Sequence, residues 1–525
     1  MRSFRMNIGQ AHVRLVQAGA VLAAAALVAG CGNGVRPTVT TVTPSGPAAQ
    51  PVSYAVVVSA PSSTTAGIAT IFDYSGDTWM AQASIGIGPT AFALDSFGSA
   101  GYTIDSNGTI SSFPVSTTLQ NNAVTYTTLL KTAQPLNLFM SIGGLWAADL
   151  DGNVADAFTG SPETFLKSIP LAPTPVSIAG TGGVSTRDFG ISQGNSQGEN
   201  ISSPVQCNVS PATGPQGEAD AIDTSSYTIY SQIPLGKCPV YAIESSDGKR
   251  LFVLNRGSDT VSVINIEDGS LDSCTPYTNQ AGQTVTCHPT LPLSQAALDA
   301  TNAPPNCNFT SDPTCSLPAD GGLPATAGPV YAEYNSAKGL LVIANYDGGT
   351  ISIIDVSLDK WGNDSSTFGT TFTVPVGKNP ASVTVLYDGS RAYSANQTDQ
   401  TVSIVNLSSH TLVGTLPVTG HPRTVVSTQN SSYGKVYVGS PDSNVLTIIR
   451  TDEDIVDTTQ RVEGNIVDVR VSSQTATKGN SNTGSRVPGY GQPCNLPLSE
   501  FDPASSSDTA VAYANCQVQD VTKLK

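Results

Sequence analysis

The sequence is poor in charge and in histidine. Only 12% of its 525 residues are charged and only four are His, so the residue most often used for acid–base catalysis is scarce. Cations are the minority, with 24 Lys and Arg against 40 Asp and Glu. The net charge of -16 argues against nucleic acid or anionic lipid headgroups as partners. What the chain has in excess is Gly (49) and Pro (35), which indicates many turns between strands.

Apolar runs long enough to span a membrane, about 20 residues, do not occur in the sequence. The run Ala18–Ala29 is shorter and ends in small residues. It follows a segment that contains three arginines and no acidic residue. This arrangement is the pattern of a secretory signal peptide.

The residues Val28–Cys31 resemble the bacterial lipobox, whose Cys is diacylated and becomes the first residue of the mature protein. The resemblance implies that residues 1–30 are a lipoprotein signal peptide and that Cys31 carries the lipid anchor. Stable anchoring takes at least two acyl chains, which such a Cys supplies. Gly32 stands where Asp commonly signals retention in the inner membrane, so the outer membrane is favoured. An ordinary secretory signal with a chance Cys is the alternative.

Closely spaced cysteine pairs of the CxxC type are missing, which argues against a metal site. Cys287-His288 resembles the end of a haem-attachment CxxCH, but Thr284 stands where its first Cys should be. Apart from Cys31, eight cysteines remain, an even number that suits disulfides in an oxidising compartment. Proximity in the sequence predicts four pairs: Cys207–Cys238, Cys274–Cys287, Cys307–Cys315 and Cys494–Cys516.

Four segments of the sequence repeat one pattern. Each has a β-rich run, a polar turn with Gly, Asp or Asn, and a second run of alternating Val and Ile, as paired antiparallel strands do. The segments are 251–271, 340–359, 391–420 and 435–456. A strand that starts with Pro, a position where Pro is tolerated, precedes each: Pro239, Pro329, Pro380 and Pro422.

Each unit therefore predicts one four-stranded blade. It resembles the YVTN-type β-propeller repeat, which runs from Gly-x-x-Pro through Asp-Gly to a strand that ends in Asn. The matching asparagines are Asn255, Asn345 and Asn396, whereas the last unit has Gly439. The literal YVTN tetrapeptide does not occur. The resemblance is clear over about 237–465 and weaker before it, and it implies an all-β propeller.

Three earlier units start at Pro89, Pro135 and Pro175, which makes seven starts. After the seventh start, the segment 464–473 supplies one further strand, and 53–86 supplies three. Joining these two segments gives a composite blade from both chain ends, which removes the open edges of the ring. The count therefore favours eight blades, although seven is usual in the family.

Two intervals between the starts exceed the 40 to 45 residues or so of a blade. They predict insertions at about 192–218 and 272–327, which carry most of the cysteines. We expect these insertions to be the functional loops of the protein. The propeller is expected to span 52–473. A Pro/Thr-rich tether (31–51) precedes it, and a polar tail (474–525) with a disulfide follows.

The sequence predicts no catalytic, cofactor-binding or metal-ligating residue. Gly190–Gly194 matches the GxSxG nucleophile pattern, but an overlapping match at 194–198 in a Gly/Ser/Gln loop indicates low complexity. Asp149–Asn153 resembles a calcium loop and is better explained as a hairpin turn. His410 and His421 are expected in turns, and His288 is the one histidine in a plausible functional loop.

These features predict a lipid-anchored β-propeller of the cell envelope that binds or scaffolds a partner through loops on one face. The expected partners are the membrane, through Cys31, and an envelope protein, peptide or glycan, without a cofactor. The alternative is an enzyme, because lactonase-like and quinoprotein-like propellers resemble this group and place active residues around the central channel. Inward-pointing Glu, Asp, Arg or His at one channel mouth would distinguish the two.

Overall fold

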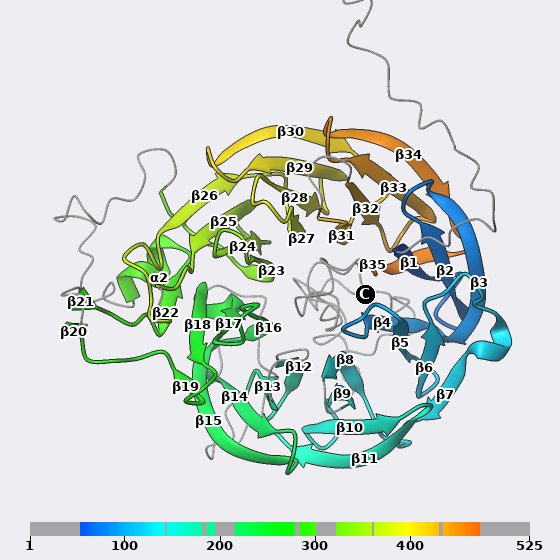
Figure 1. The fold of residues 1–525 in the computed structure, drawn as a ribbon, viewed down its shortest axis with the longest axis horizontal. Helices are drawn as coiled ribbons and strands as arrows, with labels where there is room; N and C mark the ends of the chain where they lie inside the picture. The colour runs from blue at the N-terminus through cyan, green and yellow to red at the C-terminus, as the bar shows by residue number, and fades with distance from the viewer. Residues whose placement is uncertain are drawn as a thin grey trace, which may run out of the picture. The chain divides into compact units, whose positions relative to one another are not determined.

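The computed structural model describes residues 53–141, 144–180, 186–194, 216–278, 284–300, 322–359, 362–429 and 434–472. Eight four-stranded antiparallel sheets stand in a ring around a central channel (Figure 1). The chain is thus a β-propeller, and the expected count of eight blades is confirmed. The predicted signal peptide, tether and C-terminal tail lie outside the described residues. Within the described ranges, no helix is both long and apolar enough to cross a membrane.

We number the blades from the N-terminus and give strands from the channel outwards. Blade 1 has β35 (Asn465–Val471), β1 (Tyr54–Ala60), β2 (Ala66–Asp73) and β3 (Thr78–Ile87). Blade 2 has β4 (Pro89–Leu94), β5 (Ala100–Asp105), β6 (Thr109–Pro114) and β7 (Thr125–Thr128), with η1 (Asn121–Ala123) before β7. Blade 3 has β8 (Pro135–Ser141), β9 (Gly144–Asp149), β10 (Val154–Gly160) and β11 (Glu163–Pro170). Blade 4 has β12 (Pro175–Gly180), β13 (Arg187–Ser192), β14 (Gln216–Asp223) and β15 (Thr228–Lys237).

Blade 5 has β16 (Pro239–Glu244), β17 (Arg250–Asn255), β18 (Thr260–Asn265) and β19 (Ser270–Leu271), with η2 (Arg256–Ser258) after β17. Its insertion adds β20 (Tyr277–Thr278), β21 (Thr284–Val285), β22 (Thr290–Pro292) and α2 (Gln295–Ala300). Blade 6 has β23 (Pro329–Asn335), β24 (Leu340–Asn345), β25 (Thr350–Asp355) and β26 (Thr371–Pro375). Blade 7 has β27 (Pro380–Val385), β28 (Arg391–Asn396), β29 (Thr401–Asn406) and β30 (Thr411–Pro417). Blade 8 has β31 (Thr424–Ser427), β32 (Lys435–Gly439), β33 (Val445–Arg450) and β34 (Ile455–Arg461).

The predicted prolines stand at the start of the innermost strands. The innermost strand of blades 2 to 7 begins with its Pro, and in blade 8 the strand begins two residues after Pro422. Pro has no N–H to donate, so the first residue of an edge strand suits it. Its ring also needs space in the preceding blade. A Cβ on Gly217 would stand 2.4 Å from the Pro239 ring, so a glycine is required at that position.

The repeated Asn is explained by its hydrogen bonds within the blade. Asn255 is fully buried, and its Nδ2 donates to Thr260 Oγ1 (3.2 Å) and Ser262 Oγ (2.9 Å) on the next strand. The same pair of bonds recurs in blades 6 and 7 from Asn345 and Asn396. These amides tie the second strand to the third, which accounts for their place in the repeat.

The ring closes through the composite blade that the sequence predicts. β35 pairs antiparallel with β1, for example Val57 with Val469 and Ala55 with Val471. Next to this ladder, Ser59 Oγ donates to the Glu463 carbonyl oxygen (2.8 Å). The two ends of the described chain thus share one sheet, and neither β1 nor β35 leaves an open edge toward the other.

Polar side chains also connect neighbouring innermost strands along the channel. The Ile178 N–H of blade 4 donates to Asn137 Oδ1 of blade 3 (2.9 Å), and the Val425 N–H of blade 8 donates to Ser382 Oγ of blade 7 (3.0 Å). Glu333 Oε2 of blade 6 accepts the Val385 N–H of blade 7 in the same way (3.0 Å). These bonds satisfy backbone groups at the inner edges of the blades, which no neighbouring strand pairs.

Candidate functional site

The insertion on blade 5 interrupts the outermost strand of that blade. β19 pairs with one end of β18, and β22 pairs with the other end, through Thr260 with Pro292 and Val261 with Leu291. Part of the predicted insertion therefore belongs to the sheet. Between β19 and β22 the chain leaves the ring and carries the short β20–β21 hairpin at its periphery (Figure 1).

A disulfide closes the base of this excursion. Cys274 and Cys287 are bonded, with their Cα atoms 5.5 Å apart, which confirms the predicted pair. The loop between them is thereby fixed where it departs from blade 5. The remaining cysteine predictions are not tested in this way. Cys238 is disulfide-bonded, but its predicted partner lies outside the described residues, as do the other cysteines with an assigned role: Cys31, Cys207, Cys307, Cys315, Cys494 and Cys516.

A pocket of about 530 Å³ lies beside this disulfide, and we call it the loop pocket. Such a volume is within the usual range for small-ligand sites. Its walls come from two turns of blade 5, from the start of the insertion, from a loop of blade 6 and from one side chain of blade 4. The charged side chains and the disulfide that line it are Arg187, Lys249, Arg250, Glu267, Asp268, Asp272, Cys274, Cys287 and Asp364.

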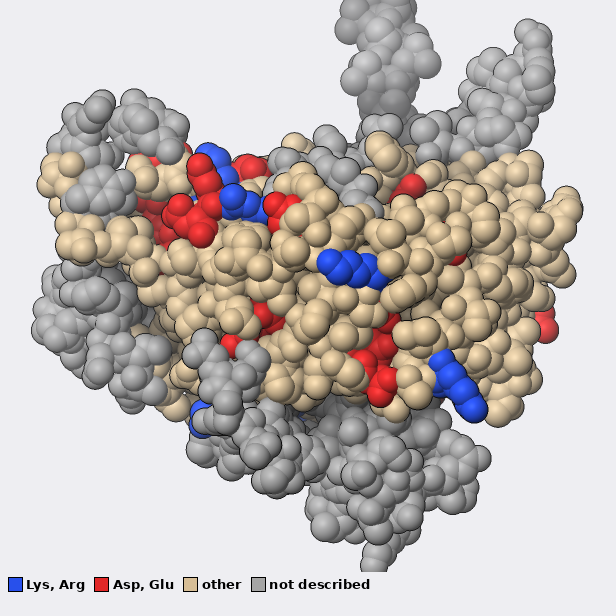
Figure 2. All heavy atoms as spheres, turned by 90° about the horizontal axis from the view of Figure 1, so that it is seen from below, with Lys and Arg blue, Asp and Glu red and all other residues tan. Residues whose placement is uncertain are grey.

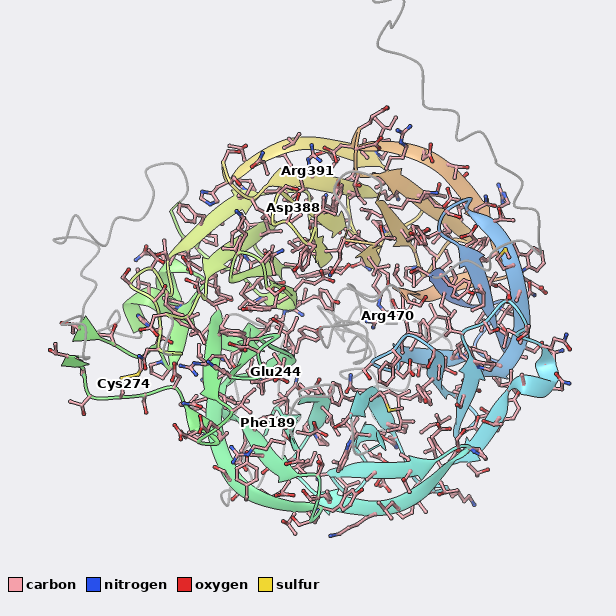
Figure 3. All side chains as sticks on the ribbon, viewed as in Figure 1. Phe189, Glu244, Cys274, Asp388, Arg391 and Arg470 are labelled. Carbon is pink, nitrogen blue, oxygen red and sulfur yellow. A yellow bond between two sulfur atoms is a disulfide. The ribbon has the colours of Figure 1, made fainter. Side chains whose placement is uncertain are left out.

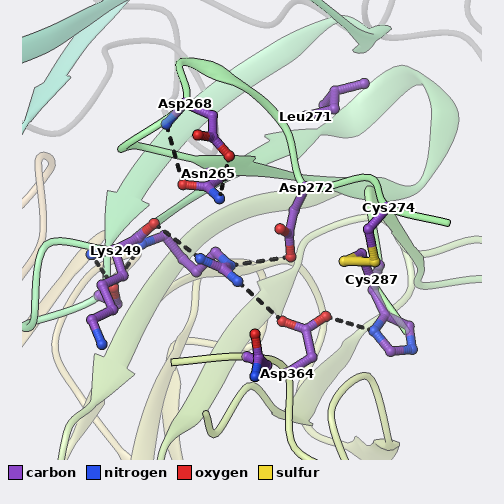
Figure 4. Close-up of polar contacts among 12 residues, drawn as sticks. Lys249, Asn265, Asp268, Leu271, Asp272, Cys274, Cys287 and Asp364 are labelled. Carbon is purple, nitrogen blue, oxygen red and sulfur yellow. Dashed lines mark hydrogen bonds and ion pairs between the residues drawn. A yellow bond between two sulfur atoms is a disulfide. The ribbon is translucent and has the colours of Figure 1, made fainter. Parts of the chain in front are cut away.

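A buried ion network forms the floor of the loop pocket (Figure 4). Arg250 donates from Nε to Asp272 Oδ2 (3.1 Å) and from Nη2 to Asp364 Oδ1 (3.4 Å). His288 Nδ1 lies 2.7 Å from the other oxygen of Asp364, and the His288 ring stacks on Phe368 with centroids 5.2 Å apart. We call Arg250, Asp272, His288 and Asp364 the Arg250 network. It joins blade 5, the insertion and blade 6.

The network holds two carboxylates against one guanidinium. Burial and the Asp364 charge, offset in part by Arg250, raise the pKa of Asp272 to about 6. A carboxylate only accepts hydrogen bonds, so Nδ1 of His288 donates to Asp364. His288 was expected to be the one histidine in a functional loop, and the structure places it in this network.

The rim of the loop pocket carries exposed charges of both signs. Lys249, Glu267 and Asp268 are exposed, and Asn265 Nδ2 holds Asp268 through Oδ2 (2.9 Å). Arg187 of blade 4 closes the remaining side, where it donates to the Ile266 and Glu267 carbonyl oxygens. Four acidic and three basic side chains thus line a single pocket, which suits a ligand that itself presents polar groups of both signs.

Sequence reasoning missed Arg250 and Asp364, although a signal for Arg250 was present. A basic residue begins the second strand in several blades, and it reaches the turn before the outermost strand of the next blade. Arg391 pairs in this way with Asp454 (2.8 Å), and Lys435 pairs with Asp77. The ion pair between Arg250 and Asp364 joins neighbouring blades in the same way. The insertion adds Asp272 and His288 to this pair.

The other sequence motifs lie in strands and turns of the blades, and the GxSxG match, predicted in a loop, lies mainly in a strand. Gly190–Gly194 lies largely in β13, an inner strand of an antiparallel sheet, and its Ser192 is fully buried. The segment after Asp149 is the turn between β9 and β10. His410 lies in the β29–β30 turn and stacks on Phe372, and His421 precedes β31.

Charged side chains also occur along the channel, where the enzyme alternative would need them. Figure 3 shows Glu244 and Arg470 on innermost strands, toward the centre of the ring. Arg470 forms an ion pair with Asp468 on the same strand (3.0 Å). Glu244 has no such pair, because neither of its carboxylate oxygens has a hydrogen-bond partner among the described residues.

No protein-family model and no curated protein matches the sequence. Among solved structures, the chain is similar to apo AztD from Citrobacter koseri, at 12% identity and a TM-score of 0.52, over 80% of this chain and 97% of that one. It is also similar to the dihydro-heme d1 dehydrogenase NirN in complex with DHE, at 12% identity and a TM-score of 0.50, over 85% of this chain and 80% of that one. At such identities the likeness concerns the propeller fold alone.

Proposed function

We propose that the protein is a lipid-anchored binding protein of the cell envelope and that the loop pocket holds a peptide segment of its partner. The supporting observation is that covalent and ionic bonds hold the walls of the pocket in place. The Cys274–Cys287 disulfide and the Arg250 network hold its walls on two blades. A site fixed in advance loses little conformational entropy on binding, so more of the contact energy appears as affinity.

A peptide fits the chemistry of the pocket better than a ligand of one charge sign. Glu267 and Asp268 can pair with Lys or Arg of a peptide, and Lys249 can pair with an acidic side chain or a terminal carboxylate. Charged side chains are sparse on the side of the molecule drawn in Figure 2, and acidic and basic ones lie near one another there. Where charges of both signs lie close together, short-range polar matching contributes to which ligand binds.

The anchor and the repeat family are further parts of this proposal. The lipobox resemblance at Cys31 supports the anchor. The YVTN-type repeat is supported by contacts between its characteristic residues. Gly377 belongs to the Gly-x-x-Pro start of blade 7. A Cβ at this position would lie 2.7 Å from the Asn396 Cβ, so the repeated Asn leaves room for glycine alone.

The test is a peptide-library selection on the immobilised full-length protein, followed by affinity measurements with a selected peptide. Glu267→Lys should weaken binding at least tenfold, because it removes an acidic group from the pocket rim. Ser408→Lys is the matched control, since Ser408 occupies the corresponding turn of blade 7 outside the pocket. Equal loss in both variants, or no loss with Glu267→Lys, would contradict the proposal.

One observation favours the alternative, an enzyme with its site at the channel mouth. Glu244 at the end of β16 and Asp188 of the neighbouring blade are buried carboxyls without hydrogen-bond partners among the described residues. Buried groups with perturbed pKa values often mark functional sites. Hydrolysis of lactones or esters that is lost in Glu244→Gln and kept in Glu267→Lys would support the enzyme over the binding protein.

A further inference from the structure

Gly180 admits a carboxylate to the inner edge of blade 4. It ends the innermost strand β12 and pairs with Asp188 on β13. A Cβ on Gly180 would lie 1.9 Å from Asp188 Oδ1, so the carboxylate occupies the space of the missing side chain. Any residue other than glycine at position 180 would displace the carboxylate.

A second carboxylate approaches from the next blade. Glu244 ends β16, the innermost strand of blade 5. Burial raises the pKa of Glu244, and the negative charge of Asp188 adds to that effect. On the other side, the hydroxyl of Ser141, which ends β8 of blade 3, lies near Asp188 and lowers the pKa of that carboxyl in part. Three adjacent innermost strands thus bring their last residues together around Asp188.

Both carboxylates are buried without partners. Asp188 is 0% and Glu244 5% exposed, and none of their four oxygens accepts a hydrogen bond from the described residues. The charged groups that act on Glu244 are Asp188 and Asp247, both acidic. Two other acidic residues on innermost strands do have partners: Asp468 forms an ion pair with Arg470, and Glu333 accepts a backbone N–H. A buried anion without a counter-charge is strongly unfavourable, so this pair must either hold protons or bind a cation.

We propose that Asp188, Glu244 and the Ser141 hydroxyl form a binding site for a divalent hard cation of the calcium class. Such cations take oxygen ligands, with carboxylates bound through one or both oxygens and water in the remaining positions. Two positive charges balance the two carboxylates. The bound ion would connect blades 3, 4 and 5 at their inner ends. This site is separate from the loop pocket and does not depend on the peptide proposal.

Calorimetric titration of metal-free full-length protein with CaCl₂, and separately with MgCl₂, tests the site. We expect one calcium site at pH 8 that is lost in Asp188→Asn/Glu244→Gln and kept in Asp105→Asn, which changes a buried carboxyl elsewhere. The double variant removes uncompensated charge, so the metal-free variant should melt at or above the temperature of metal-free wild type. That melting measurement distinguishes a lost site from a lost fold. Absence of millimolar or tighter binding of either cation to wild type, or equal binding to the folded double variant, would overturn the proposal.

Discussion

Asp105 gives the sharpest test of how these blades are stabilised. It ends β5 of blade 2, where blades 5 to 7 have the repeated Asn, and it pairs with Thr109 as Asn255 pairs with Thr260. Three hydroxyls donate to its carboxylate: Ser111 (2.6 Å), Thr103 (2.8 Å) and Thr109 (3.0 Å). Burial nevertheless raises its pKa from 3.8 to about 6, because those bonds offset only part of the desolvation.

This shift determines the expected effect of Asp105→Asn on the free energy of unfolding. The folded state holds the proton more tightly than the unfolded state, so the stability that Asp105 provides is complete below about pH 4 and is lost as the pH rises through 6. A shift of about two pKa units corresponds to about 3 kcal/mol at pH 8. An Asn at 105 carries no charge, and its amide can donate to Thr109 and Ser111 as Asn255 does to their counterparts.

The assay is thermal and denaturant unfolding of wild type and Asp105→Asn between pH 4 and pH 8. We expect the variant to gain stability over wild type steadily with pH, up to about 3 kcal/mol at pH 8. Asp399→Asn is the control, since that carboxyl is exposed on a turn. A gap that does not change with pH, or a variant less stable than wild type at pH 8, would refute the reasoning.

Three further outcomes follow from the anchor and from ring closure. Cys31→Ser should release the protein from membranes and leave the propeller folded; retention of the variant in the detergent phase contradicts the lipobox interpretation. Deleting 466–525 removes almost all of β35 and should lower the melting temperature far more than deleting 474–525, whereas equal melting temperatures would reject the composite blade as the closing element. Gly439→Asn restores the repeated residue in blade 8, but a Cβ there would lie 2.7 Å from Ile466 Cγ2. We expect a loss of about 1–3 kcal/mol in unfolding free energy from this overpacking, and a gain would show that blade 8 accepts the repeat.

The fold could be predicted because its information is local. Each of blades 2 to 8 is one stretch of chain, so in the clear repeats the first Pro, the Asp-Gly turn and the Asn appear in a fixed order. Gly439 departs from the repeat for a reason that is not local. It lies in the repeat's Asn position because Ile466 of the composite blade packs there.

The candidate sites could not be predicted in the same way, because their partners lie in different blades. Arg250 and Asp364 are bonded in the structure but are separated by 114 residues in the sequence. A short sequence motif cannot indicate a contact between residues so far apart in the chain. Asp188 occupies the space that Gly180 leaves free, and a glycine at the end of a strand does not indicate which side chain will use that space. The position of the disulfide was predictable because Cys274 and Cys287 are only 13 residues apart.

The composite blade also has a consequence for the order in which the molecule can fold. β1 is synthesised first and β35 last among the described strands, and their pairing joins residues more than 400 positions apart. Contacts between such distant residues form slowly, because a long loop must close before they contribute any stability. Until that moment the chain is an open arc whose first strand exposes an unpaired edge, which is the kind of edge that other chains can join. Ring closure is therefore the step at which a newly made chain stops being prone to association.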